Sequence, residues 1–322
     1  MQAFFRTHPD RWRWVQASLF VVIIFGSGGA GAISSGVGAG AISSGVADAA
    51  ESETPTVDLP SGSRVALLGG SWVERLQNDG VFEATLHCEL DLDEVSFRNL
   101  GWSGDDVHGY ARKVFDEAEE GEQRRQKDLE LAEPSHIWIA YGASEASDGE
   151  IAVRSFAEGL RRLLDSLPQH SASIALITPP RMPGYEVADY DRRLDEIRTT
   201  IRRIANQRTL PVLADDFVAS TSDVAPGGLA FSGDGARRFA QSIAGDLGGD
   251  GADVACADRL ETLAAAVREK DRLFLHRHRP QNETYLFLFR KHEQGQNAAE
   301  VERFDELIRA ADRRIWQSAS GG

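Results

Sequence analysis

Five short apolar runs that alternate with segments of helical periodicity constrain the fold of this chain more than any other feature. Turn residues bound each run, as is typical of buried strands. The expected strands span residues 64–68, 94–98, 136–141, 173–178 and 210–213. The expected helices between them span residues 71–78, 107–119, 150–167, 190–205 and 232–247. This alternation predicts an α/β fold, in which a five-stranded parallel sheet carries helices on both faces as a three-layer sandwich.

The turns that follow the strands are where chemistry is expected, because ligands of such sheets bind at the carboxyl ends of the strands. Gly69 and Gly70 follow the first strand, and Ser71 then opens a helix. A hydroxyl there lies near free backbone N–H groups, in a positive potential. Ser71 is therefore a candidate nucleophile or anion contact. The alternative interpretation is an ordinary helix-capping serine.

Two further turns complete the pattern. The segment 99–106 (NLGWSGDD) follows the second strand, where Gly104 either offers its backbone N–H to a ligand or only completes a turn. The segment 141–145 (YGASE) follows the third strand. The strand ending in Gly-x-Ser, the Leu-Gly-x-Ser-Gly-Asp turn and the Gly-x-x-Glu together resemble the first three sequence blocks of the SGNH (GDSL-type) ester hydrolases. The resemblance covers roughly residues 63–250 and implies a flavodoxin-like sheet.

The resemblance also assigns roles by position. In that family a block-one serine attacks an ester carbonyl, and backbone N–H groups with a block-three asparagine form the oxyanion hole. Ser71 corresponds to the nucleophile, and Gly104 and Ser144 correspond to oxyanion-hole residues. Ser144 replaces the family's asparagine, although a serine can still donate one hydrogen bond. Gly70 replaces the family's block-one aspartate.

The family's fourth block, an Asp-x-x-His that supplies the base and its orienting carboxylate, is not found. Gly227 and Ala230 occupy the two positions, and no histidine occurs between His170 and His276. Removal of the base from such a triad costs several orders of magnitude in rate. We therefore expect an acyl or acetyl esterase, acting on a carbohydrate or lipid, with a weakened or absent triad. The alternative is a non-catalytic descendant that binds a glycan or a partner.

Nearby acids and the histidines of the C-terminal region are candidate substitutes for the missing base. A carboxylate is a poor base for serine unless its pKa is raised. The candidates are Asp215, Asp216, Asp223, His276 and His278, with His108 closest to the second turn.

Residues 1–32 have the order of an export signal. Arg6, Arg11 and Arg13 precede an apolar run at 17–25, and small residues follow. The run is shorter than the roughly 20 residues of a membrane-spanning helix. We expect a cleaved signal peptide and a periplasmic or extracellular protein, with an uncleaved N-terminal membrane anchor as the alternative. Residues 33–62, rich in Gly, Ala and Ser, predict a flexible linker.

Residues 251–322 predict a C-terminal helical extension, with helices expected at 258–270 and 297–316. The basic and aromatic run at 268–292 resembles an extension found on a bacterial subgroup of SGNH-like proteins. Two interpretations remain open for this segment. It docks onto the protein's own acidic body with its aromatics packed beneath, or it binds an anionic or sugar ligand.

Charge and cysteine content exclude several classes of partner. A net charge of -15 argues against nucleic acid. Cys88 and Cys256 belong to no CxxC pair, so neither a metal nor another cofactor is expected. Two buried free thiols are the default expectation, and a disulfide formed in an oxidising compartment is the alternative. The expected partner is a small-molecule or glycan ester.

Overall fold

The structure is a computed structural model that describes residues 55–320, except residues 91, 116, 118, 171, 229, 252 and 253. The signal or anchor expected at 1–32 and most of the linker expected at 33–62 lie outside the described residues. No helix within the described ranges is both long and apolar enough to span a bilayer.

One parallel sheet organises the described chain. Its strands are β1 (Arg64–Gly69), β2 (Ser96–Asn99), β3 (His136–Ala140), β4 (Ser173–Ile177) and β5 (Val212–Leu213). They pair in the order β2-β1-β3-β4-β5. Gly69 lies beside Ala140, and Leu67 lies beside Asn99. The turns after β1, β2 and β3 therefore leave the sheet at one edge, and the expected five-stranded, flavodoxin-like arrangement is confirmed.

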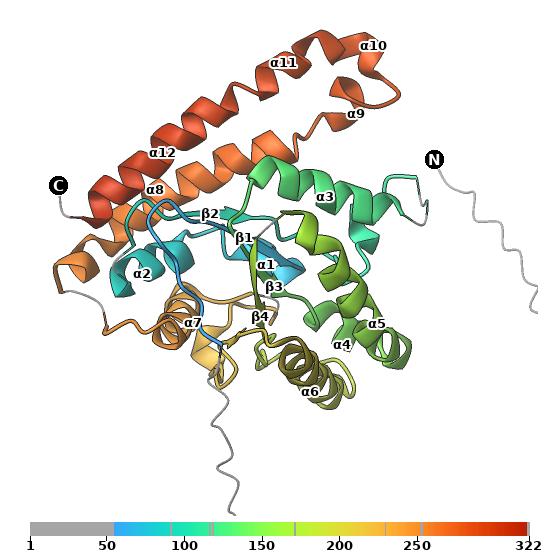
Figure 1. Cartoon of the computed structure of the whole chain (residues 1–322), viewed down its shortest axis with the longest axis vertical. Coiled ribbons are helices and arrows are strands. Elements are labelled where there is room, and N and C mark those ends of the chain that lie inside the picture. The colour runs from blue at the N-terminus through green and yellow to red at the C-terminus, as the bar shows by residue number, and fades with distance from the viewer. Residues whose placement is uncertain are drawn as a thin grey trace, which may run out of the picture. The chain divides into compact units, whose positions relative to one another are not determined.

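Helices cover both faces of the sheet (Figure 1). One layer consists of α1 (Ser71–Arg75), α2 (Val81–Glu89) and α7 (Gly233–Asp246). The other layer consists of α3 (Glu120–Ala132), α5 (Glu150–Ser166) and α6 (Tyr190–Arg208), with the short α4 (Ala143–Asp148) after β3. Val65 and Leu67 of β1 pack in the core against the layer of α1, α2 and α7, whereas Ala66 and Leu68 pack in the core against the layer of α3, α5 and α6. This alternation is what a sheet buried on both faces requires.

The prediction of a helix at 107–119 is wrong. The Asp106 side chain accepts the N–H groups of His108 and Tyr110, which offers this segment a local alternative to a helix. One 3-10 turn forms at Tyr110–Arg112, and the helix begins at Glu120 instead. Helix α3 was not predicted because its buried face includes Arg125 and Asp128 rather than a continuous apolar stripe. Helices α2 and α4 were also not predicted.

The C-terminal extension covers the edge of the sheet. It contains α8 (Val254–His278), α9 (Glu283–Leu286), α10 (Lys291–Gln294), α11 (Ala298–Val301) and α12 (Phe304–Ala319), and α8 and α12 lie side by side (Figure 1). Among the described strands, β2 pairs only with β1, so carbonyl groups on its other side need donors. Lys270 donates to the carbonyl of Phe97 at 2.9 Å, and Trp316 donates to the carbonyl of Val95 at 2.6 Å. The extension thus supplies side-chain hydrogen-bond donors to the unpaired side of the edge strand.

Buried charges attach the extension to the body. Lys270 is fully buried and contacts Glu83 at 2.5 Å. Arg98 of β2 binds Asp312 of α12 through two hydrogen bonds, of 2.6 and 3.0 Å. Within segment 268–292, Arg277 and Arg290 pair with acidic residues of the extension itself. The docking interpretation of this segment is confirmed for Lys270 and Arg279, which pair with acidic residues of the body. It is wrong for two of the aromatic side chains, Phe287 and Phe289, which are 46% and 66% exposed.

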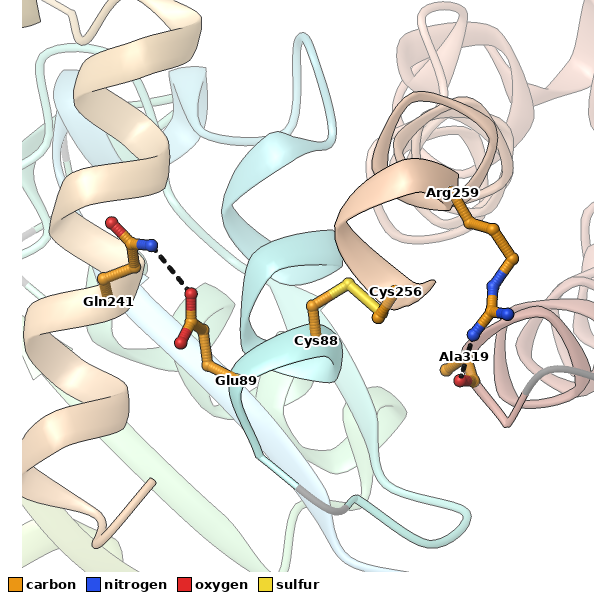
Figure 2. Close-up of a disulfide and its surroundings, with 6 residues drawn as sticks. All are labelled: Cys88, Glu89, Gln241, Cys256, Arg259 and Ala319. Carbon is orange, nitrogen blue, oxygen red and sulfur yellow. Dashed lines mark hydrogen bonds between the residues drawn. A yellow bond between two sulfur atoms is a disulfide. The ribbon is translucent and has the colours of Figure 1, made fainter. Parts of the chain in front are cut away.

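Cys88 and Cys256 form a disulfide, so the expectation of two free thiols is wrong. Figure 2 shows that this disulfide joins α2 to α8. The packing of these helices places the two Cα atoms 5.4 Å apart, which is within the usual range for a disulfide. This proximity arises between segments 168 residues apart in the sequence.

Reduction of this disulfide is expected to lower the melting temperature. Because the closed loop is long, the entropic contribution reaches about 5 kcal/mol at most. Thermal unfolding would be followed by circular dichroism with and without a reductant. The double variant Cys88→Ser/Cys256→Ser serves as the control, and its melting should not respond to the reductant. A wild-type melting curve that the reductant leaves unchanged would contradict this expectation.

Candidate active site

Ser71 lies at the N-terminus of α1, directly after β1. Gly70 precedes it as the N-cap residue, with φ of -87°. The Oγ of Ser71 accepts the backbone N–H of Gly104 at 2.9 Å. The structure therefore brings together the first two residues that the sequence singled out.

The turn that carries Gly104 lies directly on α1. Trp102 donates its N–H to the carbonyl of Gly69 at 3.0 Å, and the Asn99 side chain donates to the carbonyl of Val73 at 2.7 Å. A Cβ added at Gly101 would lie 2.3 Å from the backbone nitrogen of Glu74. Gly104 itself has φ of +76°, a region that favours glycine. The backbone of this turn is therefore fixed from β1 and α1.

A buried polar network supports the same turn from below. Arg112 is 1% exposed, and its Nε donates to Asp105 at 2.7 Å. Tyr141, at the end of β3, donates its hydroxyl to the same carboxylate at 2.7 Å. Another nitrogen of Arg112 donates to Asp128 of α3 at 2.8 Å. Burial, reinforced by the Asp105 carboxylate, raises the pKa of the Tyr141 hydroxyl, so Tyr141 remains a donor.

Ser144 shares a pocket of about 220 Å³ with Ser71 and Gly104. The three residues come from the turns after β3, β1 and β2. Among the described residues, the Oγ of Ser144 has no hydrogen-bond partner, so it is available to a ligand. The other side chains of the pocket come from α1, from α4, from the β4–α6 connection and from the start of α6. They are Trp72, Ala143, Ser147, Asp148, Pro180, Met182, Tyr185 and Tyr190.

Gly70 is a glycine for a steric reason. A Cβ at this position would lie 2.8 Å from the carbonyl oxygen of Asp105 and 2.9 Å from the Oγ of Ser144. The backbone of Gly70 has a negative φ, so the constraint is the lack of space and not the conformation. The aspartate that the SGNH family carries here has no room in this arrangement.

The loop expected to carry the fourth block reaches the pocket through Gly228. No histidine of the described chain lines the pocket. His276 lies beside Phe304, and the buried His278 bonds to the carbonyl of Phe274. His108 lies beside Ser155 at 3.4 Å.

The acids named as substitute bases do not line the pocket either. Asp215 binds Arg202 at 2.7 Å. Asp223 binds Arg238 and caps a short turn with Ser220. Asp216, like these two, does not line the pocket in the part of the chain that is described. Within the same part, no three His, Cys, Asp or Glu side chains group as metal ligands.

Sequence reasoning did not assign a role to Glu145, which lies next to Ser144. Its side chain is buried and accepts the N–H of Val107 at 2.8 Å, so it links α4 to the segment after the Gly104 turn. Burial, with a smaller contribution from the Asp106 carboxylate, raises the pKa of Glu145 to about 8. Glu145 is therefore protonated at neutral pH.

Comparison with solved structures finds similarity of fold. A lipase/acylhydrolase from Enterococcus faecalis is 22% identical, with a TM-score of 0.45 over 57% of this chain and 95% of that protein. A catalytic mutant of Axe2, an acetylxylan esterase from Geobacillus stearothermophilus, is 16% identical, with a TM-score of 0.46 over 58% of this chain and 95% of that protein. No protein-family model and no curated protein sequence matches the chain.

Gly70→Ala is expected to destabilise the protein by about 1–3 kcal/mol, because the added methyl overpacks a filled site. Gly70→Asp, which introduces the family's residue, should destabilise it further. Urea unfolding would measure both changes. Gly245→Ala is the matched control, because a Cβ there meets nothing within 4 Å. That helical substitution should be neutral or stabilising, and equal stability of Gly70→Ala and wild type would contradict the steric explanation.

Glu145→Gln is expected to gain stability relative to wild type as the pH rises. Below pH 4.5 the carboxyl is protonated in both the folded and unfolded states, and its contribution is fully present. Between pH 4.5 and 8 only the folded state holds the proton, so wild type loses about 1.4 kcal/mol per pH unit. Glutamine keeps the acceptor for Val107 without this loss.

Urea unfolding of both proteins from pH 4 to pH 9 would test this difference. Glu158→Gln, on the exposed face of α5, should show no comparable change relative to wild type. A stability difference between Glu145→Gln and wild type that is independent of pH would show that Glu145 is ionised in the folded state.

Proposed function

We propose that this chain is an exported SGNH-type ester hydrolase with a weakened catalytic triad, acting on an acyl or acetyl ester of a carbohydrate or lipid. The observation that carries the proposal is the 2.9 Å contact between the Oγ of Ser71 and the N–H of Gly104, in a pocket that Ser144 shares. A nucleophilic hydroxyl next to donors for the carbonyl oxygen is the arrangement that acyl transfer needs.

In the proposed mechanism, the Oγ of Ser71 attacks the ester carbonyl carbon, and its proton passes to solvent. The carbonyl oxygen becomes an oxyanion that accepts hydrogen bonds from the N–H of Gly104 and the hydroxyl of Ser144. Collapse of this intermediate expels the alkoxide, which takes a proton from water and leaves as the alcohol, and a water molecule then hydrolyses the acyl-serine to release the acid and restore the serine hydroxyl. An oxyanion hole and binding alone provide roughly 10³–10⁴-fold acceleration over water, so turnover is slow.

The pocket favours a short acyl group. Its volume of about 220 Å³ is below the range of about 300–1,000 Å³ that drug-sized ligands occupy. Tyr185 and Tyr190 pack edge to face, with ring centroids 4.9 Å apart, and provide an apolar wall together with Met182. A long acyl chain would have to extend out of this pocket.

Two observations support export. The disulfide between Cys88 and Cys256 is typical of proteins that fold in oxidising compartments. The basic, then apolar, then small-residue order of residues 1–32 is typical of a secretory signal. We propose a periplasmic or extracellular location.

A second candidate function is binding without turnover. It is favoured by the lack of any histidine among the described residues that line the pocket. Without an imidazole, the Ser71 hydroxyl keeps its proton at neutral pH. The same donors would then hold the oxygen of an ester or glycan ligand, and the protein would act as a receptor or carrier.

Labelling with a fluorophosphonate probe separates the two candidates. We expect slow covalent labelling at Ser71, located by mass spectrometry, and none in Ser71→Ala. The labelling rate should rise in proportion to hydroxide concentration from pH 6 to 9, because no imidazole takes the serine proton. Hydrolysis of p-nitrophenyl acetate should be lost in the same variant.

Ser147→Ala is the matched control, because Ser147 lines the same pocket but donates its hydroxyl to the carbonyl of Ala143. Its labelling rate should equal that of wild type. No labelling at Ser71 at any pH would reject the hydrolase in favour of the binding function. A rate that levels off above pH 6–7 would identify an imidazole base and contradict the weakened triad.

A further inference from the structure

One side chain of the C-terminal extension contacts both segments of the candidate active site. Arg279 follows α8 directly, and its N–H donates to the carbonyl of Leu275 at 2.8 Å. Its Nη1 donates to the Glu74 carboxylate of α1 at 2.6 Å. The same guanidinium lies over the ring of Trp102, with its central carbon 3.8 Å from the ring centroid.

These two contacts lie close to the reactive groups. Glu74 belongs to α1, the helix that Ser71 opens, and Trp102 belongs to the turn that carries Gly104. The second carboxylate oxygen of Glu74 accepts the hydroxyl of Ser103, which immediately precedes Gly104. Arg279 therefore bridges the two segments whose separation sets the distance from the Ser71 hydroxyl to the Gly104 N–H.

The contact requires an arginine. A guanidinium is planar, so it can stack on an indole ring and donate to a carboxylate at the same time, which an ammonium group cannot do. Arg112 and Arg124 also approach the Trp102 ring, at 5.1 and 5.4 Å. Both are side chains of the body that pair with Asp128, and Arg124 also pairs with Glu283 of the extension. Arg279 makes the closest of the three contacts and the one whose arginine belongs to the extension.

We propose that Arg279 is a positioning residue, which holds the Gly104 turn against α1 so that the Gly104 N–H stays at hydrogen-bond distance from the Ser71 hydroxyl. Its effect on reactivity rests on the proposed function, in which Ser71 is the reacting group. The C-terminal extension then serves the site directly, in addition to covering the edge of the sheet.

The test compares Arg279→Ala with Arg277→Ala in the full chain. Arg277 lies two residues earlier and binds Asp305 of α12 at 2.8 Å, so it is also an ion-paired arginine of the extension. Unlike Arg279, it pairs with a carboxylate of the extension itself and not with Glu74. The first readout is amide hydrogen exchange of segment 100–106 by mass spectrometry. Arg279→Ala should accelerate this exchange roughly tenfold, the equivalent of one lost cation–π contact and ion pair. Arg277→Ala should leave it unchanged.

The second readout is the rate of fluorophosphonate labelling at Ser71, measured well below the melting temperature of every variant. Arg279→Ala should lower this rate roughly tenfold, and Arg277→Ala should not, even where both variants melt at the same temperature. Arg279→Lys keeps the charge beside Glu74 but loses the stacking, so it should recover only part of the loss.

The outcomes distinguish this proposal from the proposed function. Unchanged exchange of segment 100–106 in Arg279→Ala overturns the positioning role, whatever the labelling shows. Faster exchange in that variant supports the role even if wild-type Ser71 does not react, a result that rejects only the hydrolase. Equal effects of Arg279→Ala and Arg277→Ala on the exchange also overturn the role, because they would reflect a general loosening of the extension.

Discussion

The buried contact between Arg112 and Asp105 is the interaction on which the candidate active site depends. It joins the turn after β2 to the end of β3 through Tyr141 and to α3 through Asp128. A third nitrogen of Arg112 donates to the carbonyl of Leu100 at 2.7 Å, so both ends of the Gly104 turn are held. Loss of one partner from such a buried pair typically costs about 3–5 kcal/mol, because the remaining charge has no solvent. The Gly104 turn is therefore fixed by charge as well as by backbone hydrogen bonds.

A second constraint acts at the edge of the sheet. Strand β2 is an edge strand, and without the extension the carbonyl groups of Val95 and Phe97 would lack the donors that Trp316 and Lys270 supply. The disulfide between Cys88 and Cys256 fixes the start of α8 on α2. These contacts place the end of α8, and with it Arg279, beside the Gly104 turn. The packing of the extension and the geometry of the site are thus parts of one arrangement.

Sequence patterns predicted the parts of the fold that depend on apolar periodicity. The five strands and the amphipathic helices α5, α6 and α7 were confirmed, because in each of them burial follows an apolar run or stripe. The prediction failed at 107–119 and at α3, where Arg112, Arg125 and Asp128 are buried. In a single sequence, charged residues such as these indicate an exposed segment. Their burial is possible only because partners from distant segments offset the free-energy cost of removing their charges from water.

The same distinction holds at the site. Turn motifs singled out Ser71, Gly104 and Ser144, and the structure places all three on one pocket. The lack of space at Gly70, the disulfide and the double contact of Arg279 could not be predicted, because each depends on segments far apart in the chain. Gly70 is instructive, because it differs from the aspartate of the SGNH pattern and no reason for the difference can be found in the sequence alone. In the structure, the space that a side chain at Gly70 would need is occupied by Ser144 and by the backbone of Asp105.

The bond between Ser71 and Gly104 has a consequence for any ligand of the pocket. In the free protein the Gly104 N–H is already satisfied by the serine oxygen, so an ester carbonyl must compete with that oxygen for the donor. Because Ser71 accepts this bond, its own proton is directed elsewhere, toward an acceptor on a ligand or in solvent. A ligand that accepts from Ser71 and Ser144 is held without displacing Gly104, whereas acyl transfer requires the N–H to pass from the serine oxygen to the developing oxyanion. In the proposed function, binding and slow hydrolysis are therefore successive uses of one set of donors, separated by the transfer of a single hydrogen bond.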